Sequence, residues 1–235
     1  MQFVGLGMLF FVIWYGFKDR TDATISAFDP HALVMVVVGS LSAVIMSSTF
    51  HTAMRTFVVL GEFIPGVRRF SRHTKRMEED RELLCRLWLD GKRNAAVEHA
   101  EKCPSPAIRK MLELILSRSP DAGTGKAFLE LRHHEIAEWQ PAVLSWEMLS
   151  KLGPSFGMVG TITGMISLFK NMSSDNLNIG AAMSLALLAT LYGVAFGAGF
   201  AGPISHFLNG LLDERLGCLE RCEKSVNEIV ALMER

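Results

Sequence analysis

The chain has 235 residues, with 24 Lys and Arg residues against 24 Asp and Glu residues, so its formal net charge is zero. Only 20% of the residues are charged, below the roughly 25% of soluble domains, and 49% are apolar. The zero balance excludes a nucleic-acid binder with a global basic field and an acidic disordered chain. This composition indicates a membrane protein, and four cysteines in a chain of this size do not indicate a disulfide framework.

Four stretches contain almost no charged residues, and they predict transmembrane helices at 1–17, 32–50, 148–169 and 179–212. A spanning helix needs about 20 mostly apolar residues. The first stretch has no basic residue before it and no small-residue cleavage site, which favours a membrane anchor over a signal peptide. The predicted fold class is all-α: a polytopic membrane protein with four transmembrane helices and a helical cytoplasmic lobe.

The basic residues between these stretches predict the orientation of the chain. Segment 51–150 holds sixteen Lys and Arg residues, and the tail 213–235 holds four more. The loops 18–31 and 170–178 hold two and one. Because cytoplasmic segments carry the excess of basic residues, we expect the middle segment, the tail and both termini in the cytoplasm and the two loops in the periplasm.

The segment 51–147 is expected to form the cytoplasmic lobe from several short helices. Turns or breaks are predicted at Asp90-Gly91, Cys103-Pro104 and Ser119-Pro120-Asp121. A long helix from about Gly125 is expected to end before Pro141. The segment has no Gly-rich phosphate loop and no catalytic dyad at recognisable spacing, so we do not expect an enzyme.

Two clusters have residue types that bind metals. His133-His134 lies near Glu130 and Glu138, but adjacent histidines on a helix point about 100° apart, which favours a solvated face. Cys218 and Cys222 lie one helical turn apart without a further Cys or His nearby, which favours ordinary packing. The sequence therefore predicts no bound metal and no other cofactor.

Glycines recur at helical spacing in the last two apolar stretches. Those assigned to helix packing are Gly157, Gly160, Gly164, Gly193 and Gly197. Small residues at this spacing let helix backbones approach closely in lipid. Thr161 and Thr190 are predicted to lie on the same stripes. Each hydroxyl either bonds a carbonyl of its own helix or supplies an oxygen ligand to a cation that passes in steps.

None of the four predicted spans contains an Asp or Glu residue. Ion and proton relays in membranes generally use an ionisable group within the bilayer. If this chain takes part in ion transport, the titrating group must therefore belong to another polypeptide.

Two segments, GMVGTITGMISLFKNM at 157–172 and ALLATLYGVAFGAGFAGPI at 186–204, resemble the A subunit of flagellar motor stators. This is the MotA/PomA family, related more distantly to TolQ and ExbB. The resemblance extends to FDPHALVMVVVGSLSAVIMSSTF at 28–50, to the order of four spans and to the large loop between spans two and three. It covers essentially the whole chain.

The resemblance implies a bacterial inner-membrane protein that acts in motility. Its A subunits would form a homopentamer around a dimer of single-span B subunits of the MotB/PomB kind, and the B subunit would carry the intramembrane aspartate. The flow of Na⁺ or H⁺ would drive torque on the rotor switch protein. The cation would be transported rather than held as a cofactor.

Individual residues take roles from the same resemblance. The ion pathway is expected to include Thr161, Thr190, Tyr192, Pro154 and Pro203. Rotor contacts are expected at Lys92, Arg93, Glu98 and Glu101, although an ordinary solvated helix face explains these charges equally well. Thr161 favours Na⁺, whereas Ala189-Thr190 offers one hydroxyl where sodium-type members tend to have two.

Two alternatives remain at the level of sequence. A TolQ/ExbB-like subunit would energise an outer-membrane or envelope system, and it would have three spans and an external N-terminus. A membrane scaffold without ion flux would tolerate the loss of the hydroxyls of Thr161 and Thr190.

Overall fold

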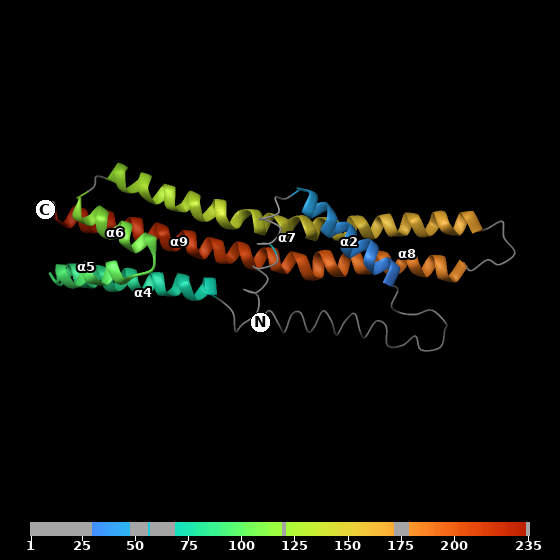
Figure 1. Cartoon of the computed structure of the whole chain (residues 1–235), viewed down its shortest axis with the longest axis horizontal. Helices are drawn as coiled ribbons and strands as arrows, with labels where there is room; N and C mark the ends of the chain where they lie inside the picture. Colours follow the sequence, from blue (N-terminus) through green and yellow to red (C-terminus); the bar gives the residue numbers. More distant parts are fainter. Residues whose placement is uncertain (1–29, 48–55, 57–68, 119–120, 172–178, 234–235) are drawn as a thin grey trace. The chain divides into compact units, whose positions relative to one another are not determined.

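The computed structural model describes residues 30–47, 56, 69–118, 121–171 and 179–233. Every element within these ranges is helical, which confirms the all-α class (Figure 1). The predicted first span at 1–17 lies outside the described residues, as do most of the predicted loops 18–31 and 170–178.

The described helices follow one another in chain order. They are α2 (Pro30–Ser47), α4 (Arg69–Leu89), α5 (Arg93–Lys102), α6 (Pro106–Leu116), α7 (Asp121–Asn171), α8 (Ile179–Val194), the π-helix η2 (Ala195–Ala201) and α9 (Gly202–Met233). They divide into two compact units. The first unit comprises 1–57 and 142–206, and the second comprises 58–141 and 207–235.

Three stretches of described helix are long and apolar enough to cross a membrane. They are Pro30–Ser47, Gly123–Lys170 and Met183–Met233. These stretches contain the third predicted span and overlap most of the second and fourth, and the chain is a membrane protein. The count of four spans stays a prediction.

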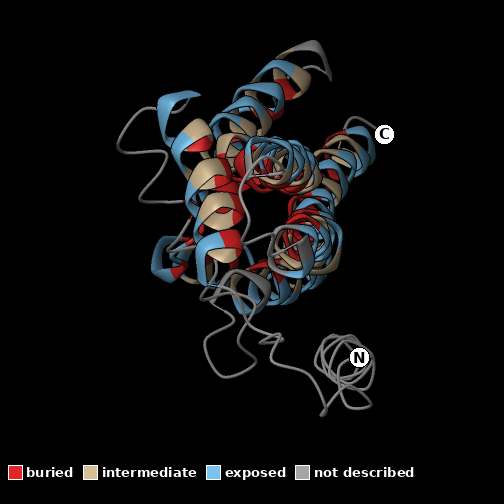
Figure 2. Ribbon diagram, turned by 90° about the vertical axis from the view of Figure 1, so that its right-hand side faces the viewer, coloured by how far each residue is buried: buried red, intermediate tan, exposed pale blue. Residues whose placement is uncertain are grey.

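In the first unit, α2 presents one face to its neighbours. Its buried residues, Ala32, Val36, Ser40 and Val44, are four apart and therefore share a stripe (Figure 2). Ala32 packs against Leu188 and Ala189 of α8. The buried Ser40 hydroxyl donates a hydrogen bond to the Val36 carbonyl at 2.6 Å, which satisfies the polar group within the apolar helix.

The second unit has a hydrophobic core that α4, α5, α6 and α9 build together with the beginning of α7. Its fully buried members include Met77, Leu84, Ile108, Phe128 and Val226. The predicted turn at Asp90-Gly91 separates α4 from α5, and the positive φ of 77° at Gly91 explains why glycine stands there. The predicted break at Cys103-Pro104 lies between α5 and α6.

The helix expected to end before Pro141 does not end there, so this prediction was wrong. Helix α7 continues through Pro141 and Pro154 to Asn171. Proline removes one intrahelical hydrogen bond and disfavours helical backbone at the preceding residue. Once the turns on both sides have formed, however, propagation gains a bond at each further residue, and Ala142, Val143 and Trp146 become buried directly after the proline.

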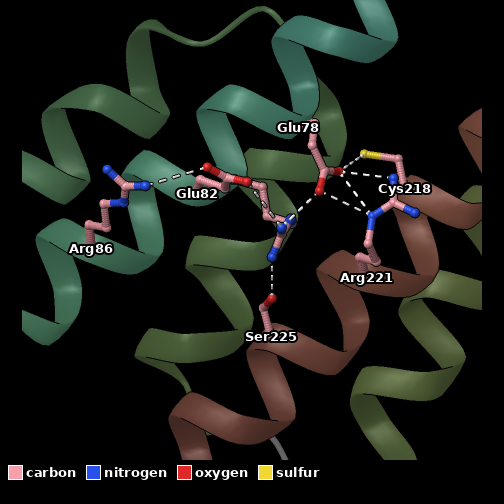
Figure 3. Close-up of polar contacts among 7 residues, drawn as sticks. Glu78, Glu82, Arg86, Cys218, Arg221 and Ser225 are labelled. Atoms are coloured by element: carbon pink, nitrogen blue, oxygen red, sulfur yellow. Dashed lines mark hydrogen bonds and ion pairs between the residues drawn. The ribbon is translucent and has the colours of Figure 1, made fainter.

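A cluster of charged groups around Glu78 ties α9 to α4 (Figure 3). The Glu78 carboxylate accepts hydrogen bonds from Arg81 at 2.8 Å, from Arg221 Nε at 3.1 Å and from the Cys218 thiol at 3.0 Å. Arg81 also donates to the Ser225 hydroxyl at 2.8 Å. Burial alone would raise the pKa of Glu78, but the hydrogen bonds from Cys218, Arg221 and Arg81 outweigh it and lower the pKa to about 2.

Two further ion pairs join α9 to α7 within the second unit. Arg215 Nη2 lies 2.7 Å from Glu135 Oε1, and both side chains are largely buried. Arg132 pairs with Glu223. Breaking such a pair leaves an uncompensated charge in a region of low polarity, so these contacts constrain how the helices align.

Glu78→Gln is expected to destabilise the second unit at neutral pH, by on the order of 1 kcal/mol, because two arginines lose a charged acceptor. The pKa of Glu78 is lower in the folded protein than its ordinary value of 4.5. Its contribution to stability is therefore present above pH 4.5 and is lost as the pH falls towards 2. Thermal unfolding measured at pH 7, 5 and 3 should show a smaller acid loss in E78Q than in the unmodified protein.

Glu79→Gln is the matched control, because Glu79 lies beside Glu78 on the same helix and its side chain is exposed to solvent. If E79Q and E78Q behaved alike at all three pH values, the cluster would have no special role in stability.

Candidate functional site: the glycine seam

Helix α7 meets α8 and η2 through backbone atoms rather than side chains. A Cβ atom added at Gly153 would lie 2.7 Å from the Gly193 carbonyl oxygen and 2.8 Å from the Gly197 Cα atom. One added at Gly157 would lie 3.0 Å from the Ala189 carbonyl oxygen and 3.2 Å from the Thr190 Cα atom. Backbone atoms cannot rotate aside as side chains do, so this contact requires glycine. We call it the glycine seam.

The seam continues along both helices beyond these contacts. A Cβ atom at Gly160 would overlap the Ala189 Cβ atom, and Gly164 is also buried. On the opposite side, Gly193 meets the Gly153 carbonyl oxygen and the Gly157 Cα atom. The structure thus brings together on one interface four of the five glycines that the sequence analysis assigned to packing, Gly157, Gly160, Gly193 and Gly197.

Pro154 shapes one part of the seam. It has no N–H group to donate to the Ser150 carbonyl one turn earlier, so that oxygen lacks its usual intrahelical partner. A Cβ atom at Gly197 would lie 2.6 Å from this carbonyl oxygen and 2.5 Å from Pro154 Cδ. The Cα–H group of Gly197 therefore points at the oxygen that Pro154 leaves unbonded, a weak but favourable contact.

The π-helix η2 precedes Pro203 directly. The N–H group of Gly202 donates to the Gly197 carbonyl, five residues earlier, which is the bonding pattern of a π-helix. Pro203 is the second residue of α9, which continues from η2 without a break, so its missing N–H group interrupts the backbone bonding there; the residue is exposed. Phe200 of η2 makes an edge-on contact with Trp146, with ring centroids 6.1 Å apart.

The two threonines lie at the rim of the seam, because both are partly exposed whereas the neighbouring glycines are buried. The Thr161 hydroxyl donates to the Met158 carbonyl at 2.6 Å, and the Thr190 hydroxyl donates to the Ala186 carbonyl at 3.2 Å. Tyr192 lies elsewhere, packed against the cluster of Ala32, Leu188 and Ala189. Of the five expected pathway residues, the seam and its rim bring together Pro154, Thr161 and Thr190.

The four charges expected at the rotor are all exposed and lie at or within α5. Lys92 precedes the helix, and the Arg93 guanidinium stacks over the Trp88 ring at 5.6 Å. Glu98 pairs with Lys102 one turn away, and this hydrogen bond and charge lower the pKa of Glu98. Glu101 also faces solvent. The arrangement fits both a docking face and an ordinary solvated helix.

Neither cluster of metal-binding residue types forms a metal site in the part of the chain that the structure describes. His133 and His134 are exposed. Cys218 and Cys222 are buried, and the hydrogen bond between them and burial raise the pKa of Cys218, so it stays a thiol and donates to Glu78.

Sequence reasoning missed three contacts that hold the first unit. Ser150 contributes its carbonyl oxygen to Gly197 and its hydroxyl oxygen near Gly202, and its position four residues before Pro154 was the available signal. The ring of Phe156 occupies the space where Gly39 lacks a side chain. Trp146 Nε1 donates to the Thr56 carbonyl at 3.0 Å, and no sequence pattern pointed to this contact across 90 residues.

A known protein family matches this chain. The profile of the MotA/TolQ/ExbB proton channel family matches residues 99–221, which is more than half of the chain and includes the whole seam. The chain belongs to this family.

Individual relatives agree with the family. The chain is 29% identical over 137 residues to motility protein A of Aquifex aeolicus, a match that covers 55% of this chain and 53% of that protein. It is 34% identical over 113 residues to motility protein A of Cereibacter sphaeroides, covering 46% of this chain and 42% of that protein. The matched part thus spans about half the length of these relatives.

Two solved structures share the fold. The flagellar MotAB stator complex from Bacillus subtilis has a chain with a TM-score of 0.74 at 16% identity, covering 97% of this chain and 88% of that chain. The C. jejuni MotAB structure gives a TM-score of 0.73 at 12% identity, with coverage of 97% and 89%.

Gly153→Ala is expected to lower the stability of the first unit by about 1–3 kcal/mol, because the added methyl group meets backbone atoms that cannot move aside. The measurement is the midpoint of thermal unfolding of the purified protein in detergent. Gly180→Ala is the control, since a Cβ atom there has no neighbour within 4 Å and alanine favours the helix. Equal midpoints for the two variants would contradict the seam.

Proposed function

We propose that this chain is the A subunit of an ion-driven rotary stator, which couples cation flow across the bacterial inner membrane to torque on a flagellar rotor. Membership of the MotA/TolQ/ExbB proton channel family supports the ion coupling. The names of the matched relatives, motility protein A and, over 42 residues at 48% identity, the chemotaxis protein PomA of Vibrio alginolyticus, favour the stator branch over the TolQ/ExbB branch.

The observation that carries the proposal is the placement of two hydroxyl groups beside a seam that contains no carboxylate. Each threonine hydroxyl donates its single hydrogen bond to a carbonyl oxygen of its own helix. Its oxygen lone pairs stay available as ligands, because a hydroxyl accepts as well as donates. The two roles that the sequence left as alternatives are therefore compatible: the internal bond orients the hydroxyl whose oxygen contacts the cation.

These oxygens stabilise a cation but cannot exchange a proton at neutral pH. Step-wise transport within a bilayer generally uses an ionisable group, and the predicted spans of this chain supply none. In the proposed assembly, five copies of the chain surround a dimer of single-span B subunits, and the B subunit supplies an aspartate opposite the threonines. The two matched structures are of MotAB assemblies, which supports a partner of this kind.

The seam gives this assembly a stiff wall. Because α7 touches α8 and η2 through backbone atoms, the two helices move together rather than sliding past each other. We further propose that both termini and the second unit face the cytoplasm, where the exposed charges of Lys92, Arg93, Glu98 and Glu101 contact the rotor. The transported ion is Na⁺ or H⁺, with Thr161 favouring Na⁺.

Thr161→Ala is expected to reduce motility in a strain whose only copy of the protein carries the change. Loss of one oxygen ligand weakens cation binding by about 1 kcal/mol, which corresponds to somewhat less than tenfold in affinity. Swimming speed of single cells is the measurement, and Thr161→Ser should restore it because the hydroxyl returns.

Thr163→Ala is the matched control. Thr163 lies on the same helix and donates the same kind of internal hydrogen bond, to the Val159 carbonyl at 2.8 Å. Its side chain is exposed, and because it lies two residues from Thr161 it points to a different side of the helix. If T161A swam as fast as T163A and the unmodified protein, the proposed ion route along Thr161 would be refuted.

A further inference from the structure

A pocket of about 200 Å³ opens in the second unit where α4 passes the beginning of α6. It is lined by Arg72, His73, Arg76, Met77, Asp80, Pro104 and Ser105. All of these residues belong to one compact unit, and apart from Met77, which is part of its hydrophobic core, none has been given a role above.

Ser105 is the feature of this pocket that packing does not explain. It is the N-cap of α6 and only 2% exposed, yet its hydroxyl makes no capping bond and its Oγ atom has no hydrogen-bond partner among the described residues. A serine at this position usually accepts a bond from the first turn of the helix. A buried polar atom left unpaired is costly, so this hydroxyl favours a ligand that can form a hydrogen bond with it.

The beginning of α6, directly after Ser105, has backbone donors of its own. The first turn of a helix leaves backbone N–H groups without intrahelical partners, and the helix dipole makes this end positive. Pro106 has no N–H group, so the N–H groups of Ala107 and Ile108 are the first available ones, and no side chain caps them. Backbone N–H groups in this arrangement bind anions.

The charges around the pocket also favour an anion. Arg72, Arg76 and His73 come from one face of α4, and Arg76 makes no ion pair with any residue in the described ranges. Asp80 is the single acidic residue of the lining; its carboxylate accepts a hydrogen bond from the Cys103 thiol at 3.0 Å, and one of its oxygens lies 3.3 Å from His99 Nε2. Burial and the bond to Asp80 raise the pKa of Cys103 to about 11, so the thiol keeps the proton that it donates.

We propose that this pocket binds a phosphate group, carried by a soluble phosphate ester or by an anionic lipid headgroup. The Arg76 guanidinium, the Ser105 hydroxyl and the first N–H groups of α6 are the donors. Met77 and Pro104 form an apolar wall beside them that suits the organic part of such a ligand. The site is independent of the stator function proposed above, because it shares no residue with the seam or with the charges of α5.

Calorimetric titration of inorganic phosphate into the full-length protein, held in nanodiscs of phosphatidylcholine, tests the soluble source. Arg76→Gln and Ser105→Ala are each expected to weaken binding about tenfold, since each removes one hydrogen bond to a charged group. Arg86→Gln is the matched control: it removes the same charge from the same helix at an exposed position outside the pocket, and binding should not change.

The lipid source is tested with the same four proteins in nanodiscs that contain phosphatidic acid, by the rise in unfolding temperature over phosphatidylcholine alone. A response in either experiment that R76Q and S105A reduce and R86Q does not supports the pocket, and the responding experiment identifies the source. The proposal is overturned if neither probe acts, or if R76Q and S105A respond as the unmodified protein or R86Q does.

Discussion

The direct contact between the backbone of α7 and that of α8 and η2 is the constraint on which the first unit depends. Side chains normally keep helices 8–10 Å apart, and along the seam there is no room even for a methyl group at Gly153, Gly193 or Gly197. Everything else at the site follows from this approach. Thr161 and Thr190 lie at the rim because the glycines occupy the centre, and Pro154 faces Gly197 because no side chain keeps them apart.

The two prolines and the π-helix are best understood together. Pro154 leaves the Ser150 carbonyl without an intrahelical partner, and the seam covers that oxygen with the Cα–H group of Gly197. On the opposite helix, η2 changes the hydrogen-bond pattern from four to five residues just before Pro203. Both helices thus give up regular bonding over the same few residues. Local irregularities of this kind are common where helices line functional sites.

Much of this arrangement could be predicted from the sequence because it depends on local rules. Absence of charge located the apolar helices, glycine spacing located the seam, and Asp90-Gly91 located a turn whose positive φ needs glycine. The continuation of α7 through Pro141 was not predictable in this way. A rule based on neighbouring residues accounts only for the hydrogen bond that is lost at Pro141. The burial of residues such as Trp146 after the proline depends on segments distant in sequence.

The ion pairs of the second unit could not be predicted from the sequence either. Glu78 pairs with Arg221 across 143 residues, and Glu135 pairs with Arg215 across 80. Equal numbers of acids and bases reveal nothing about which will meet, and neither does helical periodicity. The unpaired hydroxyl of Ser105 could not be predicted from the sequence either. A serine directly before Pro106 is typical of an ordinary helix N-cap, whose hydroxyl would be bonded.

The central claim is that this chain supplies oxygen ligands and a stiff wall for a cation but no titrating carboxylate, so that transport requires a partner. The most direct measurement is uptake of Na⁺ and of protons by liposomes that contain the purified chain, with and without the proposed single-span B subunit. We predict flux with that subunit, none with the chain alone, and none when the aspartate proposed for that subunit is replaced by asparagine. Equal flux from the chain alone would contradict the account.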